Sequence, residues 1–223
     1  MTIEERIFDR CVFDFKRLLE YGFIKDCDSY IYERDIMDDE FHVAIRINHD
    51  GSVSSSVIDK MNDEEYKVFR FDSQKSPFVS SVRSCYEELL KDIASNCCNT
   101  LLFSSKQANR ISERIYSEYH VCPDFPWSDT SGVFRHKESG KWFALIMRIK
   151  WKNLLKDENE EGINAINLKI DPSESQRLTS IKGIYPGFHM NHKNWITVVL
   201  DDSVSDDLVM QLVAESYQLT KKK

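Results

Sequence analysis

The chain has 223 residues, of which 41% are hydrophobic and 30% are charged, and its net charge is −7. This composition is typical of a globular protein, and no apolar run approaches the ~20 residues of a membrane-spanning helix. With 7 Gly and 5 Pro, a low-complexity chain is excluded, and the negative charge argues against a basic face over the whole protein.

Charge divides the chain unequally. Residues 1–99 carry 13 Lys and Arg against 21 Asp and Glu, whereas residues 100–223 carry 17 against 16. Proteins that grip phosphate backbones usually present a local basic surface. Such a surface is therefore expected, if anywhere, in the second half.

The six cysteines form no CxxC pair and no framework spacing. Cys97 and Cys98 are adjacent and poorly placed to pair with each other. We therefore expect reduced thiols in a cytoplasmic protein. The start of the sequence is acidic and amphipathic, unlike a secretory signal.

The first half is predicted to be a helix, four strands and a second helix. Thr2 and Glu5 form a capping-box pattern ahead of apolar residues at helical spacing, which predicts a helix over about 3–21. A Ser-Pro pair at 76–77 begins the second helix. Strands are expected over residues 28–35, 40–47, 52–59 and 65–71. The result is a self-contained, acidic α+β domain over residues 1–96.

The second half is predicted to follow a similar plan. Ser104 and Gln107 suggest the cap of a first helix, and Ser205 caps the last one. Residues 131–137 and 141–149 flank a Glu-Ser-Gly turn and predict a hairpin, with further strands over 164–170 and 194–200. We therefore predict two small α+β domains, 1–96 and 100–223, the second with an antiparallel sheet and flanking helices.

The second half resembles the MmcQ/YjbR family over about residues 104–219. The segments that carry the resemblance are "PDFPWSDTSGVFRHKESGKWFALI", "INLKIDPSESQRL", "YPGFHMNHKNWITVVLD" and "VSDDLVMQLVAESYQL". The resemblance implies a CyaY-like, or double-wing, α+β fold and a DNA-binding role. The first half resembles the extra N-terminal region of longer family members. His192 is a departure, because the family usually has lysine directly after the asparagine that is Asn191 here.

The predicted hairpin tip is the candidate nucleic-acid contact. Arg135, Lys137 and Lys141, with His136 between them, would contact phosphates from a projecting β-ribbon. His189 and Lys193 would line the adjacent entry to the last strand. Lys106, Arg110 and Arg114 recur at helical spacing and would add local positive charge. The alternative is that these side chains are charged only because they are exposed to water.

A candidate pocket involves Trp127, His189, Asn191 and Trp195. A Pro-Gly turn precedes His189, and alternation along an entering strand would place His189, Asn191 and Lys193 on one face. The alternative is that His189 and Asn191 satisfy backbone groups of the bend, while the two tryptophans cover the core.

Catalytic and metal-binding patterns are weak. Asp124 and Asp129 could form a carboxylate pair, and His189 and His192 are three residues apart, but no accompanying motif completes either site. We therefore expect no metal and no cofactor, and a non-enzymatic protein is favoured over an enzyme.

Two functional hypotheses follow. The first is a binding module with DNA as the partner that the family resemblance implies. The second is a regulatory protein that binds another protein or a small ligand in a pocket around His189, without any nucleic-acid role. In either case the acidic first domain is a possible surface for another protein, and no membrane association is expected.

Overall fold

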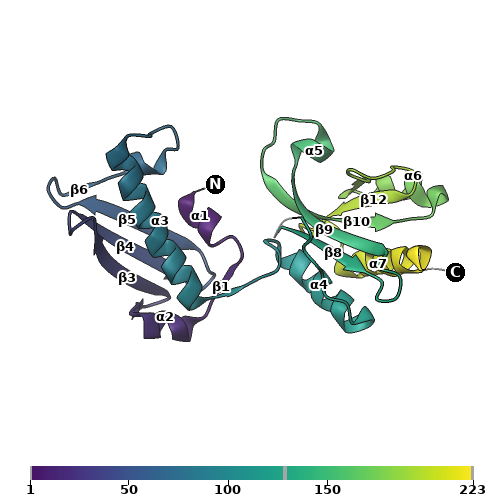
Figure 1. Ribbon diagram of the computed structural model, residues 1–223, viewed down its shortest axis with the longest axis horizontal. Coiled ribbons are helices and arrows are strands. Elements are labelled where there is room, and N and C mark those ends of the chain that lie inside the picture. Colours follow the sequence, from purple (N-terminus) through teal and green to yellow (C-terminus); the bar gives the residue numbers. More distant parts are fainter. Residues whose placement is uncertain (1, 128–129, 222–223) are drawn as a thin grey trace. The chain divides into compact units, whose positions relative to one another are not determined.

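The computed structural model describes residues 2–127 and 130–221 and contains two compact units, Met1–Leu101 and Leu102–Lys223 (Figure 1). Each unit has a five-stranded antiparallel sheet with its main helices packed on one face, so the protein is α+β, as predicted. Within the described residues, no helix combines the length and the apolar character needed to cross a membrane.

The first unit contains a five-stranded meander and a separate two-stranded ribbon. Its elements, in chain order, are α1 (Ile3–Ile7), β1 (Cys11–Phe13), α2 (Phe15–Tyr21), β2 (Ile24–Asp26), β3 (Ser29–Ile36), β4 (Phe41–Asn48), β5 (Val53–Asp59), β6 (Glu64–Glu65), the 3-10 helix η1 (Val68–Arg70), α3 (Pro77–Cys97) and β7 (Cys98–Thr100).

The single helix predicted over residues 3–21 is wrong. The capping box of Thr2 and Glu5 does begin α1, but the chain then forms β1, which pairs with β7. Asp14 begins a second helix, α2, with its side chain accepting hydrogen bonds from the next backbone N–H groups. The helical spacing of apolar residues is real, but pairing with a strand distant in sequence outweighs it.

The central strands β3, β4 and β5 confirm three of the four strand predictions. Alternate residues of β4 are buried beneath α3, and the face they form includes Val43, Ile45 and Ile47. The strand predicted over residues 65–71 is wrong, because only two residues pair as β6. The chain then turns into η1, which buries Phe69 completely against the core.

A buried carboxylate joins four elements of the first unit, α1, β5, η1 and α3. Glu4 on α1 accepts hydrogen bonds from Arg70 at 2.6 Å, from Ser55 at 2.7 Å and from the hydroxyl of Tyr86. Burial raises the pKa of Glu4, but these three hydrogen bonds together outweigh it and lower the pKa to about 2. The network thus fixes α1 against β5 and α3 as a charged, fully partnered cluster.

The second unit has the sheet order β11-β12-β10-β9-β8. Its elements are α4 (Lys106–Tyr119), β8 (Ser131–Arg135), β9 (Trp142–Lys150), α5 (Lys152–Leu155), β10 (Gly162–Lys169), the 3-10 helix η2 (Pro172–Glu174), α6 (Ser175–Thr179), β11 (Ile184–Pro186), β12 (Trp195–Val199) and α7 (Asp206–Thr220). Ser105, one residue after the predicted Ser104, caps α4, and Ser205 caps α7 as predicted.

Helices α4 and α7 cover one face of this sheet, which carries the main core of the unit. Ile146, Ile166 and Val198 belong to that core and are fully buried. The opposite face carries a second apolar cluster that includes Val133, Leu145 and Met147, with Trp142 and Phe188 packed against it. Both faces of the sheet are therefore apolar.

A chain of buried polar groups holds the loop between β11 and β12. Asn167 on β10 donates a hydrogen bond to the carbonyl oxygen of Phe188 at 2.9 Å and accepts one from Thr197 at 2.6 Å. The hydroxyl of Thr197 in turn accepts the N–H of Phe188 at 2.7 Å. The asparagine of the "INLK" segment thus fixes a loop 21 residues away in sequence.

Replacing Glu4 with glutamine should lower the free energy of unfolding of the first unit by about 3 kcal/mol, because the Arg70 guanidinium loses its anionic partner. All four tryptophans lie in the second unit. In urea titrations the circular-dichroism transition of the first unit should therefore shift to a lower urea concentration. The tryptophan fluorescence transition, which reports on the second unit, should stay in place. Glu20→Gln, which breaks an exposed pair with Lys16, is the control and should move neither transition.

The same substitution should change the pH dependence. The folded pKa of Glu4, about 2, lies below its ordinary value of 4.5, so its stabilisation is complete above that ordinary value and disappears as the pH falls toward 2. The wild type should therefore lose more stability than Glu4→Gln between about pH 5 and about pH 3. Equal losses would contradict this role for the carboxylate.

Replacing Asn167 with alanine should lower the free energy of unfolding of the second unit by about 2 kcal/mol, because buried polar groups at Phe188 and Thr197 lose their partner. Tryptophan fluorescence in urea measures this change. Asn191→Ala is the matched control, since its side chain accepts one hydrogen bond at an exposed turn. A cost for Asn191→Ala as large as that for Asn167→Ala would contradict the prediction.

Candidate ligand-binding site

The β8–β9 hairpin ends in a tight turn, as predicted. The N–H of His136 donates to the carbonyl oxygen of Lys141 at 2.9 Å, and the N–H of Gly140 donates to that of His136 at 2.9 Å. Gly140 has φ +67°, a conformation that glycine adopts at little cost. The strand register shifts between Phe134 and Arg135, which pair with Ala144 and Trp142, so Phe143 is an extra residue in β9.

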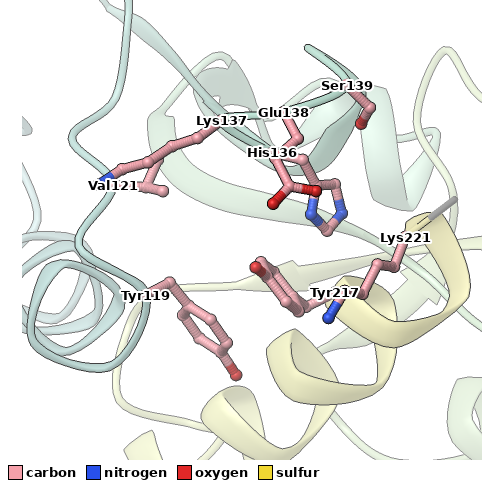
Figure 2. A pocket seen from close by; sticks show the side chains of 8 residues that line it. All are labelled: Tyr119, Val121, His136, Lys137, Glu138, Ser139, Tyr217 and Lys221. Atoms are coloured by element: carbon pink, nitrogen blue, oxygen red, sulfur yellow. The ribbon is translucent and has the colours of Figure 1, made fainter.

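A hollow of about 270 Å³ lies beside this turn (Figure 2). We call it the tip hollow. The residues that line it are Tyr119, Val121, His136, Lys137, Glu138, Ser139, Tyr217 and Lys221. It therefore joins the hairpin turn to the C-terminal ends of α4 and α7, which are distant in sequence.

Aromatic rings form one side of the tip hollow. Tyr119 and Tyr217 are stacked, with ring centroids 4.4 Å apart and an interplanar angle of 29°. The ring of His136 lies 4.3 Å from that of Tyr217, which also contacts Phe143 in an edge-on arrangement. Burial, with smaller contributions from Glu118 and Tyr217, raises the pKa of Tyr119, so its hydroxyl stays protonated at neutral pH.

His136 is buried rather than exposed at the tip, so its predicted place in a basic surface is wrong. Only 5% of the residue is exposed, and Nε2 lies 2.8 Å from the hydroxyl of Thr220. Burial, followed by the charges of Lys221 and Lys141, lowers the pKa of His136 and favours the neutral ring. His136 lies two residues after Phe134 and therefore on the same helix-covered face of the sheet, where α7 buries it, and the sequence pattern did not reveal that cover.

Ser216 sets the position of α7 at this site. Its buried hydroxyl accepts the N–H of Lys169 at 2.8 Å and donates to the carbonyl oxygen of Phe143. The helix is thereby tied to β10 and β9 one residue before Tyr217. No local pattern predicts this contact, because Phe143 and Ser216 are 73 residues apart.

Exposed charged side chains surround the opening. Lys137, Glu138, Lys141 and Lys221 are all exposed, and Lys141 lies on the turn outside the lining. In Figure 2 the Glu138 carboxylate and the Tyr217 hydroxyl point into the hollow, while the Lys137 side chain extends toward Val121. The tip hollow therefore combines an aromatic wall with a rim of mixed charge and an excess of lysine.

Arg135 differs from the two predicted lysines. Its Nε donates to the Asp124 carboxylate at 3.1 Å, and its guanidinium lies 5.3 Å from the centre of the Trp142 ring. It also contacts the carbonyl oxygen of Gly140. Arg135 therefore braces the hairpin, and of the three predicted phosphate contacts Lys137 and Lys141 are the exposed ones. Asp129, the other predicted carboxylate, lies outside the described residues.

The arginines of α4 are paired with acids. Arg110 binds Asp206 at 2.8 Å and also Asp202, and Arg114 binds Asp207 at 2.9 Å. These acids belong to α7 and the segment before it. The two arginines therefore connect α4 to α7, and they do not extend the lysine rim of the tip hollow.

His189, Asn191 and Lys193 lie in the loop between β11 and β12. The predicted strand-like alternation is wrong, because the segment is a series of turns with His189 at φ +56°. Asn191 accepts the N–H of Lys193 at 2.9 Å, which stabilises one of these turns. His189 and Lys193 are exposed, and the His189 ring contacts Phe188 at 4.0 Å.

The four residues of the predicted pocket occupy two places. Trp127 is 59% exposed and packs edge-on against Trp142, with ring centroids 5.0 Å apart. Trp195 begins β12 and is half-buried. Within the described residues, no ring contact joins Trp127 to His189 or to Trp195. No group of three His, Cys, Asp or Glu side chains in the same part of the chain is placed to hold a metal ion.

The second unit matches known proteins. The YjbR family model covers residues 117–219. YyaQ of Bacillus subtilis (strain 168) is 34% identical over 113 residues, which are 50% of this chain and 95% of that protein. YbdF of Escherichia coli O157:H7 is 35% identical over 75 residues, 33% of this chain and 62% of that protein. A crystal structure of a Pseudomonas syringae protein is 32% identical and covers 50% of this chain and 97% of that one, with a TM-score of 0.48.

The matched region of the family model contains the β8–β9 hairpin, the "INLK" strand and all of α7 but its last residue, and so includes every lining residue of the tip hollow except Lys221. A relative that is 34% identical along nearly its whole length establishes common descent for this unit. Through its second unit, the chain belongs to the YjbR family.

Proposed function

We propose that the second unit is a non-enzymatic binding module that holds a single nucleic-acid strand at the β8–β9 tip. The observation that carries the proposal is the tip hollow, in which stacked tyrosines lie beside exposed lysines. Single-strand binding sites combine these two chemistries, because cations attract the phosphates and aromatic rings stack on unpaired bases.

The dimensions support one inserted nucleoside. The tip hollow of about 270 Å³ lies just below the range of about 300–1,000 Å³ usual for small-molecule sites. A base can lie against Tyr119 or Tyr217, with the phosphates on either side near Lys137 and Lys141. Glu138 faces the same space and can accept a hydrogen bond from an amino group of a base.

The charge distribution favours a single strand over a duplex. Arg110, Arg114 and Arg135 are engaged with aspartates, so they do not form a continuous basic face with the tip lysines. Duplex binding usually depends on many phosphate contacts along such a face. A short strand needs only a few contacts, because base stacking supplies part of the affinity.

The side chains at the tip hollow support binding rather than catalysis. His136 is the one imidazole among its lining residues, and its Nε2 is engaged by Thr220 inside the unit. Glu138 is exposed on a turn, where its carboxylate is hydrated by water. The proposal therefore assigns positioning and charge to these residues and no bond-breaking step.

The double variant Lys137→Ala/Lys141→Ala should bind a fluorescent single-stranded oligonucleotide at least about tenfold more weakly at low salt. Its log–log salt slope should be shallower by about 1.4, since each phosphate contact on a single strand contributes about 0.7. Fluorescence polarisation of the full chain at about 50 and about 200 mM salt measures both quantities. Lys106→Ala/Lys182→Ala, which removes the same charge from exposed sites elsewhere in the unit, should leave both unchanged.

Absence of binding to either single-stranded or duplex oligonucleotides by the wild type at low salt would refute the proposal. Binding of a free mononucleotide without binding of a strand would instead favour the small-ligand regulator considered from the sequence. That ligand would then occupy the tip hollow and not the surroundings of His189, where the predicted residues do not converge.

Replacing Tyr119 with leucine should weaken single-strand binding by about five- to a hundredfold, since base stacking contributes about 1–3 kcal/mol per base. The salt slope should not change, because no phosphate contact is lost. Tyr119→Phe keeps the ring and should bind like the wild type. Tyr116→Leu is the matched control, because Tyr116 is exposed on the same helix and does not line the hollow. An equal effect of Tyr116→Leu would contradict stacking at this place.

A further inference from the structure

The first unit places two cysteines on one face of the β1–β7 ribbon, one on each strand. The register pairs Cys11 with Thr100 and Phe13 with Cys98, so the two cysteines lie on one face as diagonal neighbours. The two thiols are close enough to shift each other's pKa, downward for Cys11 and upward for Cys98. All six cysteines of the chain are free thiols in the structure.

The two sulfurs differ in access to solvent. Cys98 is only 7% exposed and belongs to the apolar core, whereas Cys11 is half-buried at its margin. The neighbouring Cys97 is fully buried, and its thiol is directed to the carbonyl oxygen of Arg17. A small oxidant can therefore reach Cys11 first, with Cys98 directly behind it.

We propose that Cys11 and Cys98 are a redox-active dithiol that hydrogen peroxide converts into an intramolecular disulfide. In the first step the Cys11 thiolate attacks one peroxide oxygen, the O–O bond breaks, and hydroxide leaves, so that Cys11 becomes a sulfenic acid. In the second step Cys98 gives up its proton and its sulfur attacks that of Cys11, the S–O bond breaks, and hydroxide leaves. Two thiols and one peroxide thus yield one disulfide and two water molecules.

The electrostatics support this order of attack. Interaction with the Cys98 thiol lowers the pKa of the Cys11 thiol and outweighs its partial burial. The same interaction, followed by burial, raises the pKa of Cys98. Cys11 is therefore the attacking sulfur and Cys98 the resolving one. The resulting disulfide would close a loop from residue 11 to residue 98, which contains the five-stranded sheet and α3 of the first unit.

Peptide mapping of the full chain tests the proposal. The background is Cys27→Ser/Cys122→Ser, which removes the two exposed thiols. The reduced protein is treated with hydrogen peroxide, alkylated and digested with trypsin without reduction. Cleavage after Arg10, Lys16, Lys91 and Lys106 places Cys11 in the peptide 11–16 and both Cys97 and Cys98 in the peptide 92–106.

The expected product is the 11–16 peptide joined to the 92–106 peptide, with a mass two hydrogens below their sum. Adding Cys98→Ser should abolish this product and leave an oxidised, unjoined Cys11, whereas adding Cys97→Ser should preserve it. The oxidised protein should also unfold at a higher urea concentration in its circular-dichroism transition, and reduction should reverse that shift.

Two results would overturn the proposal. One is a cross-link that survives Cys98→Ser and disappears with Cys97→Ser, because the resolving thiol would then be the wrong one. The other is a 92–106 peptide that loses two hydrogens by itself, because Cys97 and Cys98 would then have paired with each other. Each serine variant is first checked by circular dichroism, so that a failure to fold is distinguished from a failure to cross-link.

Discussion

The tip hollow depends on a single buried hydroxyl. Ser216 satisfies the N–H of Lys169 and the carbonyl oxygen of Phe143, two backbone groups at neighbouring strand ends that would otherwise be buried without a partner. Since a buried unsatisfied backbone group costs about 1–3 kcal/mol, α7 has one favoured position along the sheet. Tyr217 and Thr220 follow on the same helix, and they fix the ring of His136 beside the hairpin turn.

The two units share one arrangement of helices and sheet but differ in their polar contacts. In each, a helix precedes an antiparallel sheet, a second helix follows it, and both helices cover the same face. In the first unit, Glu4 and Arg70 connect the short N-terminal helix to the rest of the unit, and every group of this charged cluster is paired. In the second unit, arginine–aspartate pairs connect α4 to α7 at the surface, and a buried serine hydroxyl connects α7 to the sheet. A buried carboxylate is thus part of the first unit's core, whereas the ion pairs that join the helices of the second lie at its surface.

Much of the fold could be predicted, because helix caps and alternating strands are local signals. Ser76 and Ser205 begin their helices as expected, and three strands of the first sheet lie where alternation placed them. The failures have non-local causes, as where β1 pairs with β7 across most of the first unit. At the candidate site, Lys137 and Lys141 were predictable as turn residues. The roles of His136 and Tyr217 were not, because they depend on packing between β8 and α7, where His136 and its partner Thr220 are 84 residues apart.

The extra residue in β9 also limits how this surface can vary. Hairpin tips usually tolerate insertions and deletions, since few contacts depend on their length. Here the register shift leaves Phe143 as an extra residue in β9, between the partners of Phe134 and Arg135. Its ring packs against those of His136 and Tyr217, and its carbonyl oxygen accepts the hydroxyl of Ser216. Deleting one residue there would restore regular pairing but would remove the contacts that hold α7 and His136 beside the turn. The number of residues in β9 is therefore a structural constraint of this unit.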